Sequence, residues 1–154
     1  MNSRGSIKKK EINKAGEIYF NMCKKYCIFA AQFLPHMGGI ENYTYNISKE
    51  LIKRGNQVTV ITNNTTNSPL QETIEGIKVL RFPCFNFING RFPVMKLNKD
   101  FWKIHRYLKK QQYDIVVINA RFYLHSIYAA AYARHKKIKY MCIEHGTSHL
   151  SVHS

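Results

Sequence analysis

The sequence is poor in acidic residues. Nine Asp and Glu stand against 24 Lys and Arg, so the chain of 154 residues carries a formal net charge of +15 at pH 7. This imbalance predicts an anionic ligand or surface, for which nucleic acid, acidic lipid and phosphorylated small molecules all qualify. A lysine-rich composition without functional meaning would produce the same charge.

Aromatic residues interleaved with the basic ones are also lacking. The aromatic residues fall mostly in apolar, strand-like segments that belong in a core. Proteins that bind single-stranded nucleic acid instead place aromatic rings among their cationic side chains, where the bases can stack on them. We therefore expect no nucleic-acid partner, although the charge alone leaves that alternative open.

Cysteine is scarce and long hydrophobic runs are absent. The cysteines form no C-x-x-C pair and stand mostly in apolar segments, at Cys23, Cys27, Cys84 and Cys142. This pattern favours buried, reduced thiols and a cytoplasmic protein. No segment approaches the ~20 apolar residues that cross a bilayer. The apolar run at residues 27–34 contains Gln32 and begins well inside the chain, which argues against a secretion signal.

Internal repeats and the common phosphate-binding fingerprints are missing as well. The chain has neither a G-x-G-x-x-G nor a Walker loop. Its length and its hydrophobic fraction of 45% predict one globular domain with a proper core. We place this domain at residues 25–154. Residues 1–24 are polar and basic, and are expected to form a flexible arm or a weak helix.

Residues 27–62 are the unit around which the rest is organised. An apolar run (27–34) predicts a strand, and Gly38-Gly39 permits a tight turn after it. A helix should follow, ending at Gly55, because apolar residues recur at helical spacing at Ile40, Tyr43, Ile47 and Leu51. The β-branched run at 57–62 predicts a second strand, parallel to the first.

The remaining segments predict further layers on this unit. Strands are expected at 76–82, 114–119 and 138–143, and a helix that is apolar nearly all round and packed on the sheet at 122–135. Residues 84–95 carry aromatics without a period and are expected to be a long connection, packed as a surface loop or, as the alternative, folded over the strand ends where an acceptor would sit. The fold class is therefore α/β, with a Rossmann-like parallel sheet and helices on both faces.

Residues 96–111 predict an amphipathic helix. One face is apolar, with Leu97, Phe101, Ile104 and Leu108. The opposite face is cationic and includes Lys96, Lys99, Lys103 and Arg106. Such a stripe could contact an acidic membrane surface or an anionic acceptor. It could equally be the solvated face of a surface helix.

The turn at Gly38-Gly39 is a candidate ligand site. Ligands of open α/β sheets bind beyond the carboxyl ends of the strands, and free amides at a helix N-terminus attract phosphate or carboxylate. Glycine would let such a group approach the backbone. The alternative is that the two glycines only make the turn.

Three segments resemble family 4 glycosyltransferases, which are retaining, nucleotide-sugar-dependent enzymes of the GT-B fold. The first is FLPHMGGIENYTYNISKELIKRGNQVTVIT, with its glycine loop and the K-R-G-x-x-V-x-V strand. The others are YDIVVINA and IKYMCIEHG, which are similar to the family's D-I-V-H-x-H strand and its strand ending in histidine-glycine. The resemblance covers about residues 25–150 and implies the N-terminal domain of such an enzyme.

The resemblance implies transfer of a sugar from a nucleotide-sugar to an acceptor hydroxyl, with retention at the anomeric carbon. The acceptor would be a glycan or a lipid-linked molecule. The resemblance also places His145 beside the transferred sugar, as the catalytic candidate. It further implicates residues of the glycine loop and the histidine loop in binding the donor phosphates or the substrate: Gly38, Gly39, Glu41, Glu144 and Gly146. Neither a metal nor another cofactor is expected.

One departure from the family is clear. Its members carry two glutamates separated by seven residues in a second Rossmann-like domain, and no such pair occurs here. We expect an incomplete N-terminal domain, such as a truncated or interrupted gene product would have, which does not transfer sugar alone and leaves a long parallel sheet edge exposed. The alternative function is a non-catalytic phosphate- or nucleotide-binding module. The expected location is the cytoplasm, with peripheral association with the inner face of the membrane as an option.

Overall fold

A six-stranded sheet is the centre of the protein. The computed structural model describes residues 10–12, 18–20, 23–87, 92–119 and 124–144. In these residues the sheet order is β10-β9-β3-β4-β6-β5, and only β5 runs antiparallel to its neighbour. The strands are β3 (Lys25–Ala30), β4 (Gln57–Asn63), β5 (Gln71–Ile74), β6 (Ile77–Phe82), β9 (Ile115–Asn119) and β10 (Lys139–Ile143).

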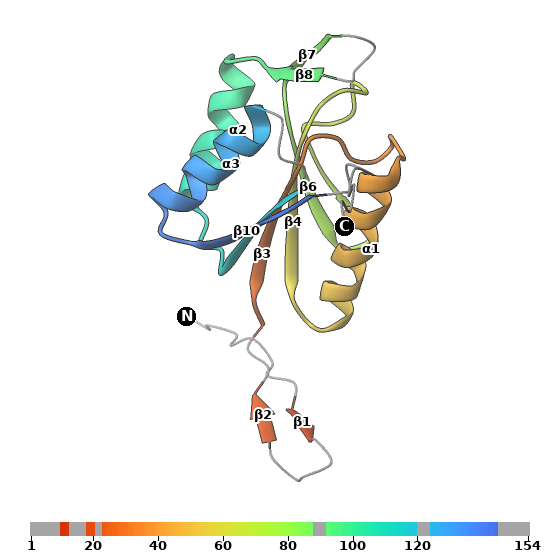
Figure 1. Ribbon diagram of the computed structural model, residues 1–154, viewed down its shortest axis with the longest axis vertical. Coiled ribbons are helices and arrows are strands. Elements are labelled where there is room, and N and C mark those ends of the chain that lie inside the picture. The colour runs from red at the N-terminus through yellow and green to blue at the C-terminus, as the bar shows by residue number, and fades with distance from the viewer. Residues whose placement is uncertain (1–9, 13–17, 21–22, 88–91, 120–123, 145–154) are drawn as a thin grey trace, which may run out of the picture.

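Helices cover both faces of this sheet, as expected for the Rossmann-like α/β class. Helix α1 (Gly39–Lys53) lies on one face, and α2 (Lys99–Lys110) and α3 (Leu124–His135) lie side by side on the other (Figure 1). The predicted strand–helix–strand unit is confirmed, because β3 and β4 pair in parallel with Tyr26 opposite Val58.

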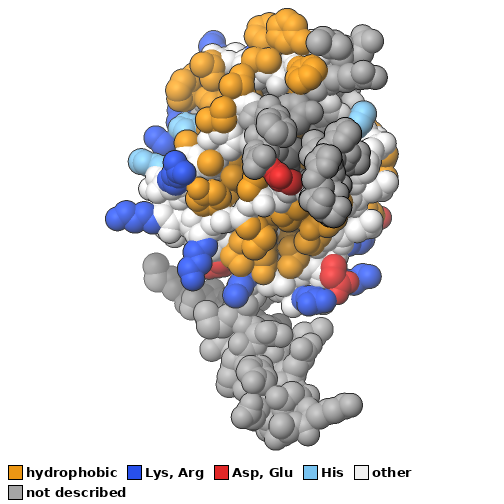
Figure 2. All heavy atoms as spheres, viewed as in Figure 1, with side chains coloured by type: hydrophobic (Ala, Val, Ile, Leu, Met, Phe, Trp, Pro, Cys, Tyr) orange, Lys and Arg blue, Asp and Glu red, His pale blue; other side chains and the backbone are white. Residues whose placement is uncertain are grey.

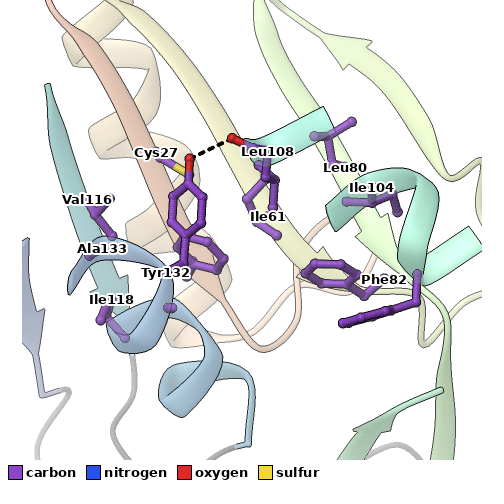
Figure 3. Close-up of a cluster of buried hydrophobic side chains, with 13 residues drawn as sticks. Cys27, Ile61, Leu80, Phe82, Ile104, Leu108, Val116, Ile118, Tyr132 and Ala133 are labelled. Carbon is purple, nitrogen blue, oxygen red and sulfur yellow. Dashed lines mark hydrogen bonds between the residues drawn. The ribbon is translucent and has the colours of Figure 1, made fainter. Parts of the chain in front are cut away.

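Two apolar clusters, one on each face, form the core. The cluster under α2 and α3 contains Phe29, Phe82 and Leu108, and the cluster under α1 contains Ile28, Val60 and Val79. Figure 3 shows Tyr132 of α3 in the first cluster, with its hydroxyl donating a hydrogen bond to the Leu108 carbonyl oxygen at 2.9 Å. Burial raises the pKa of this tyrosine, so the phenol stays protonated and ties α3 to the end of α2.

Helix α1 is buried along a different line from the one predicted. Its deepest residues are Glu41, Thr44 and Ser48, whereas Tyr43 is 36% exposed. The hydroxyls of Thr44 and Ser48 donate to the helix carbonyls of Ile40 and Thr44, so they are buried without losing a hydrogen bond. Their small size lets α1 approach the sheet closely, and the larger apolar side chains pack at its flanks.

The aromatic connection is a hairpin, where a loop without secondary structure was expected. Strands β7 (Cys84–Phe87) and β8 (Phe92–Met95) pair antiparallel. Helix α2 then begins at Lys99, three residues later than predicted, because the Asn98 side chain caps it by accepting from the amides of Asp100 and Phe101. Leu97 therefore lies outside the helix and is 70% exposed rather than part of its buried face.

Strand β5 was not predicted. It joins β6 through Glu75 and Gly76, which both have positive φ values (46° and 85°), as a two-residue hairpin turn requires. Gly76 therefore belongs to the turn and not to the strand that was expected to start there.

Several predicted boundaries and exposures differ as well. The basic extension contains two short paired strands, β1 (Lys10–Ile12) and β2 (Ile18–Phe20), where an arm or a weak helix was expected. Strand β3 ends at Ala30 rather than at residue 34. Helix α3 is not buried all round, since Leu124 and Ile127 are 53% and 66% exposed.

Two further expectations can be compared with the described residues. All four thiols are free, but two of them, Cys23 and Cys142, are exposed rather than buried. Strand β10 is the edge of the described sheet, and its apolar residues Tyr140 and Met141 are 40% and 51% exposed. No helix among the described residues is long and apolar enough to span a membrane.

Candidate substrate site at the carboxyl edge of the sheet

The carboxyl ends of five parallel strands meet at one edge of the sheet. Ala30 at the end of β3 lies opposite Asn119 at the end of β9, and Asn63 ends the neighbouring strand β4. Strand β6 runs at this edge into the β7–β8 hairpin, and the loop from β3 to α1 carries Gly38 and Gly39 across it. This is the edge at which ligands of open α/β sheets bind.

The two glycines have different roles. Gly38 is the N-cap of α1, with an extended backbone at φ −128°, so its backbone does not require glycine. A Cβ there would lie 2.5 Å from Oε2 of Glu41, so the carboxylate would have to move to make room for it. A Cβ at Gly39 would meet no atom within 4 Å. The first turn of α1 therefore has open space at Gly39 and no side-chain cap, which leaves its amides approachable.

Glu41 is a buried carboxylate at the same helix end. Its Oε1 lies 3.7 Å from Nδ1 of His36, and the residue is only 8% exposed. Its negative charge lies where the positive end of the helix dipole stabilises it. A phosphate bound here would be repelled by this carboxylate on the Gly38 side, so the accessible approach is over Gly39.

Arg81 fixes the loop that carries the glycines. It is 1% exposed near the end of β6, and its guanidinium donates to the carbonyl oxygens of Leu34 and Pro69 at 2.7 and 2.9 Å. It also forms an ion pair with Glu72 of β5 at 2.5 Å. One side chain thus links the β3–α1 loop to the β5–β6 edge of the sheet, through charge-assisted hydrogen bonds.

Asn119 and Thr44 connect β9 to α1 beneath the loop. Nδ2 of Asn119 donates to Oγ1 of Thr44 at 2.8 Å, and both residues are buried. On the other side of β3, Nδ2 of Asn63 donates to the Ala31 carbonyl oxygen at 3.0 Å. Two amide side chains therefore stand on either side of the end of β3.

The same region contains buried polar atoms without a hydrogen-bond partner in the structure. Among the described residues these are Thr62 Oγ1, Asn63 Oδ1, Asn119 Oδ1 and His125 Nδ1. Unpaired buried polar atoms are costly and rare, and they concentrate where water or a ligand completes a site. They mark this edge as the polar centre of the described structure.

His125 is held in its neutral form. It lies in the first turn of α3 between the rings of Phe29 and Phe82, and Nε2 is 3.0 Å from the Ile61 carbonyl oxygen. Burial lowers its pKa to about 4, partly offset by the hydrogen bond to that carbonyl. Because Nε2 must carry the proton that the carbonyl accepts, Nδ1 is left as an acceptor.

The structure places the predicted site residues unevenly. Gly38, Gly39 and Glu41 come together at the start of α1, and Glu144 follows β10 at the same edge and is exposed. His145 and Gly146 lie outside the described residues. The cationic side chains lie on or beside α2, where Lys99, Lys103 and Arg106 are exposed and Lys96 is half-buried. Their roles as binding residues stay predictions.

Sequence reasoning missed the residues that hold the edge together: Arg81, Asn119, Thr44 and His125. A signal existed for Asn119, which is polar and directly ends an apolar strand. No local signal existed for the others, because their partners lie 47, 75 and 64 residues away in the chain.

Cavities elsewhere in the described residues do not open on this edge. One of about 350 Å³ is lined by Lys25, Gln57 and Tyr113 at the amino ends of the strands, and one of about 270 Å³ lies between α2 and α3. What distinguishes the carboxyl edge is its set of buried polar groups.

Comparison with known proteins agrees with this fold. Residues 37–154 match glycosyltransferase family 4. The chain belongs to this family. It is 31% identical over 137 residues to an uncharacterized glycosyltransferase of Methanocaldococcus jannaschii, an alignment that covers 84% of this chain and 34% of the relative. The chain thus spans about a third of that protein's length.

A solved structure with the same fold is sucrose-phosphate synthase from Thermosynechococcus elongatus. The TM-score is 0.51 at 18% identity, and the match covers 79% of this chain and 32% of the other. At this identity the likeness concerns the fold alone. It agrees with the expected GT-B architecture for this family 4 domain.

Proposed function

We propose that this domain forms the acceptor-side wall of a retaining glycosyltransferase. The reaction moves a sugar from a nucleotide-sugar to a hydroxyl of a glycan or a lipid-linked acceptor. The anomeric carbon–oxygen bond to the nucleotide breaks, a bond to the acceptor oxygen forms, and the acceptor's proton leaves with the departing phosphate group. The observation that supports this most is the open, uncapped start of α1 at Gly39 in a chain of family 4.

The edge of the sheet offers suitable partners for each part of the donor. Amides at Gly39 would meet a phosphate, and the buried, unpaired acceptors of Asn63 and Asn119 would reach sugar hydroxyls through bridging water. His145 and Glu144 follow β10, and we propose that His145 hydrogen-bonds the transferred sugar. No metal or other cofactor has a part in this proposal.

The nucleotide itself needs a further binding surface. The 154 residues contain no two glutamates separated by seven residues, so we propose that a second domain supplies them. The chain on its own would then bind donor weakly and not turn it over. Free thiols at Cys23 and Cys142 fit a reducing compartment, and we propose the cytoplasm.

The test is a transfer assay with radiolabelled nucleotide-sugars and membrane or glycan extracts, using this chain and the longest polypeptide that its gene encodes. Transfer by the longer polypeptide, abolished by Gly39→Val in a folded protein, supports the proposal. Turnover by residues 1–154 alone would overturn the need for a second domain. Unchanged transfer by Gly39→Val would overturn the role of the α1 amides.

A non-catalytic phosphate-binding module is the second candidate, and it rests on the same open helix end. Inorganic phosphate and nucleoside diphosphates would then bind this chain, measured by calorimetry, and Gly39→Val would abolish that binding. Failure to find any transfer with the longer polypeptide would move this candidate ahead.

A further inference from the structure

The β7–β8 hairpin presents an apolar face to solvent. In this ribbon Phe85 pairs with Val94 and Phe87 with Phe92, and residues paired in this way have side chains on the same face. Phe85, Phe87 and Phe92 are 51%, 54% and 54% exposed. The side of the hairpin that faces solvent is therefore apolar, where a polar side is usual.

The opposite face of the hairpin is fixed to the protein. Cys84 and Pro93 are buried, and Met95 packs against the main core. Asn86 donates from Nδ2 to the Thr65 carbonyl oxygen at 3.0 Å, and the amide of Lys96 donates to the Pro83 carbonyl oxygen at 2.8 Å. The phenylalanines are thus held outward by a supported ribbon.

Further exposed apolar residues continue this surface towards the helices. Leu97 is 70% exposed just before α2, and Trp102, the chain's single tryptophan, is 49% exposed in its first turns. Figure 2 shows hydrophobic side chains gathered at the end of the molecule where Figure 1 places β7, β8 and the starts of α2 and α3. Exposed apolar patches of this kind mark sites of interaction with proteins or membranes.

Cationic side chains border this aromatic surface. Nζ of Lys96 lies 4.5 Å from the centre of the Phe85 ring. Helix α2 has five Lys and Arg residues against one acidic residue, and the exposed Lys99, Lys103 and Arg106 fall on one stripe, opposite the buried Phe101, Ile104 and Leu108. Aromatic and apolar side chains beside Lys and Arg are the composition that binds acidic bilayer surfaces.

We propose that this aromatic–cationic surface (Phe85, Phe87, Phe92, Leu97 and Trp102 with Lys96, Lys99, Lys103 and Arg106) docks the protein on an acidic membrane. The phenylalanines enter the interface between headgroups and acyl chains, and the cations contact anionic headgroups. The hairpin follows directly from β6, so the docked protein has the carboxyl edge of its sheet beside the lipid surface. The docking itself does not depend on the proposed transferase activity.

Charge complementarity favours a membrane over a protein partner. Cores of protein interfaces are depleted in charge, and in lysine in particular, whereas here Lys96 lies over the Phe85 ring and Arg106 donates to the Trp102 carbonyl oxygen. Trp102 belongs at the boundary between an apolar and a wet phase, which a bilayer interface provides.

The experiment uses Trp102 as the reporter. Its fluorescence is followed in two titrations, one with anionic vesicles of phosphatidylcholine and about a third phosphatidylglycerol, and one with neutral vesicles of pure phosphatidylcholine. Both titrations are repeated with vesicles that carry a quencher high on the acyl chain. The proposal expects a blue shift and quenching with the anionic vesicles, and partitioning at least about tenfold weaker with neutral ones.

Two variants and two matched controls divide the contributions. Two triple variants should each weaken partitioning at least about tenfold, while circular dichroism shows the native fold. One removes the aromatic rings (Phe85→Ser/Phe87→Ser/Phe92→Ser), and the other removes the cations of α2 (Lys99→Gln/Lys103→Gln/Arg106→Gln). Tyr140→Ser/Met141→Ser removes exposed apolar side chains from β10. Lys24→Gln/Lys137→Gln/Lys139→Gln removes three charges at the amino ends of the strands. Neither control should change partitioning by more than about twofold.

Four results would overturn the proposal. They are no spectral change with anionic vesicles, equal losses in variants and controls, undiminished binding after loss of the three phenylalanines, and equal binding to neutral vesicles. Undiminished binding without the three phenylalanines, together with salt-sensitive binding to unrelated oligonucleotides, would assign the surface to nucleic acid. Retention of the protein on vesicles only when membrane proteins are present would assign it to a protein partner.

Discussion

Nη2 of Arg81 donates a hydrogen bond to the Leu34 carbonyl oxygen, 2.7 Å away, and so joins the end of β6 to the loop that leads into α1. The same guanidinium holds Pro69 and Glu72. Removing a buried charge with this many partners should lower the free energy of unfolding strongly, because each partner loses its hydrogen bond at once. The glycine loop thus depends on a residue that touches neither glycine.

Replacing Arg81 tests this dependence. Arg81→Ala should lower the free energy of unfolding by roughly 3 kcal/mol, since it leaves the Leu34 and Pro69 carbonyl oxygens and the Glu72 carboxylate without their buried partner. Hydrogen exchange of the amides at residues 31–38 should accelerate under native conditions. The control is Arg54→Ala, which removes an exposed pair with Glu50 and should cost no more than about 0.5 kcal/mol. Equal effects of the two substitutions would contradict the anchoring role.

Alanine at the two neighbouring glycines should have opposite effects. Gly39→Ala meets open space at the first helical position and should leave stability unchanged or raise it by about 0.5 kcal/mol. Gly38→Ala would place its Cβ against the Glu41 carboxylate, and it should lower the free energy of unfolding by roughly 1–3 kcal/mol. Urea unfolding of both variants measures the difference. A stability loss at Gly39 as large as that at Gly38 would show that the space above α1 is not open.

The hydrogen bond between Asn119 and Thr44 should appear as a coupling energy. Thr44→Val and Asn119→Ala each remove one partner, and a double-mutant cycle should give a coupling of about 1 kcal/mol. Thr66→Ala, at an exposed hydroxyl pair with Ser68, is the matched control and should change stability by less than about 0.5 kcal/mol. Additive effects of the first two substitutions would show that the bond does not couple β9 to α1.

His125 should make the fold sensitive to acid. Its pKa is about 4 in the folded protein and about 6.5 in an unfolded chain, so the unfolded state binds more protons between these values. Stability should therefore be complete above about pH 6.5 and fall by ~3 kcal/mol as the pH drops to 4.

Thermal unfolding between pH 7 and pH 4 measures this dependence. His125→Phe should flatten the curve in this window, whatever it does to stability at pH 7. His135→Gln, at an exposed position of α3, should leave the slope unchanged. A slope that survives in His125→Phe would assign the acid sensitivity to other groups.

The sequence by itself determined the fold class and the family. Apolar runs of strand length, the helical spacing in residues 39–53 and the glycine at position 55 are local signals, because backbone geometry and burial act over a few residues. The glycine turn and its neighbourhood followed from the rule that ligands bind at the carboxyl ends of parallel strands. Strands β4 and β6, each predicted to within one residue at both ends, belong to this class of signal.

Only the tertiary structure decided which side chains complete the site. Arg81 has its partners at residues 34, 69 and 72, and Asn119 meets Thr44 across 75 residues, so no local pattern could pair them. The aromatic hairpin gave no usable period, because both of its faces carry apolar side chains, one set packed on the protein and the other exposed to solvent. Burial depends on which elements pack together, and the three-dimensional arrangement of the sheet and its helices sets that.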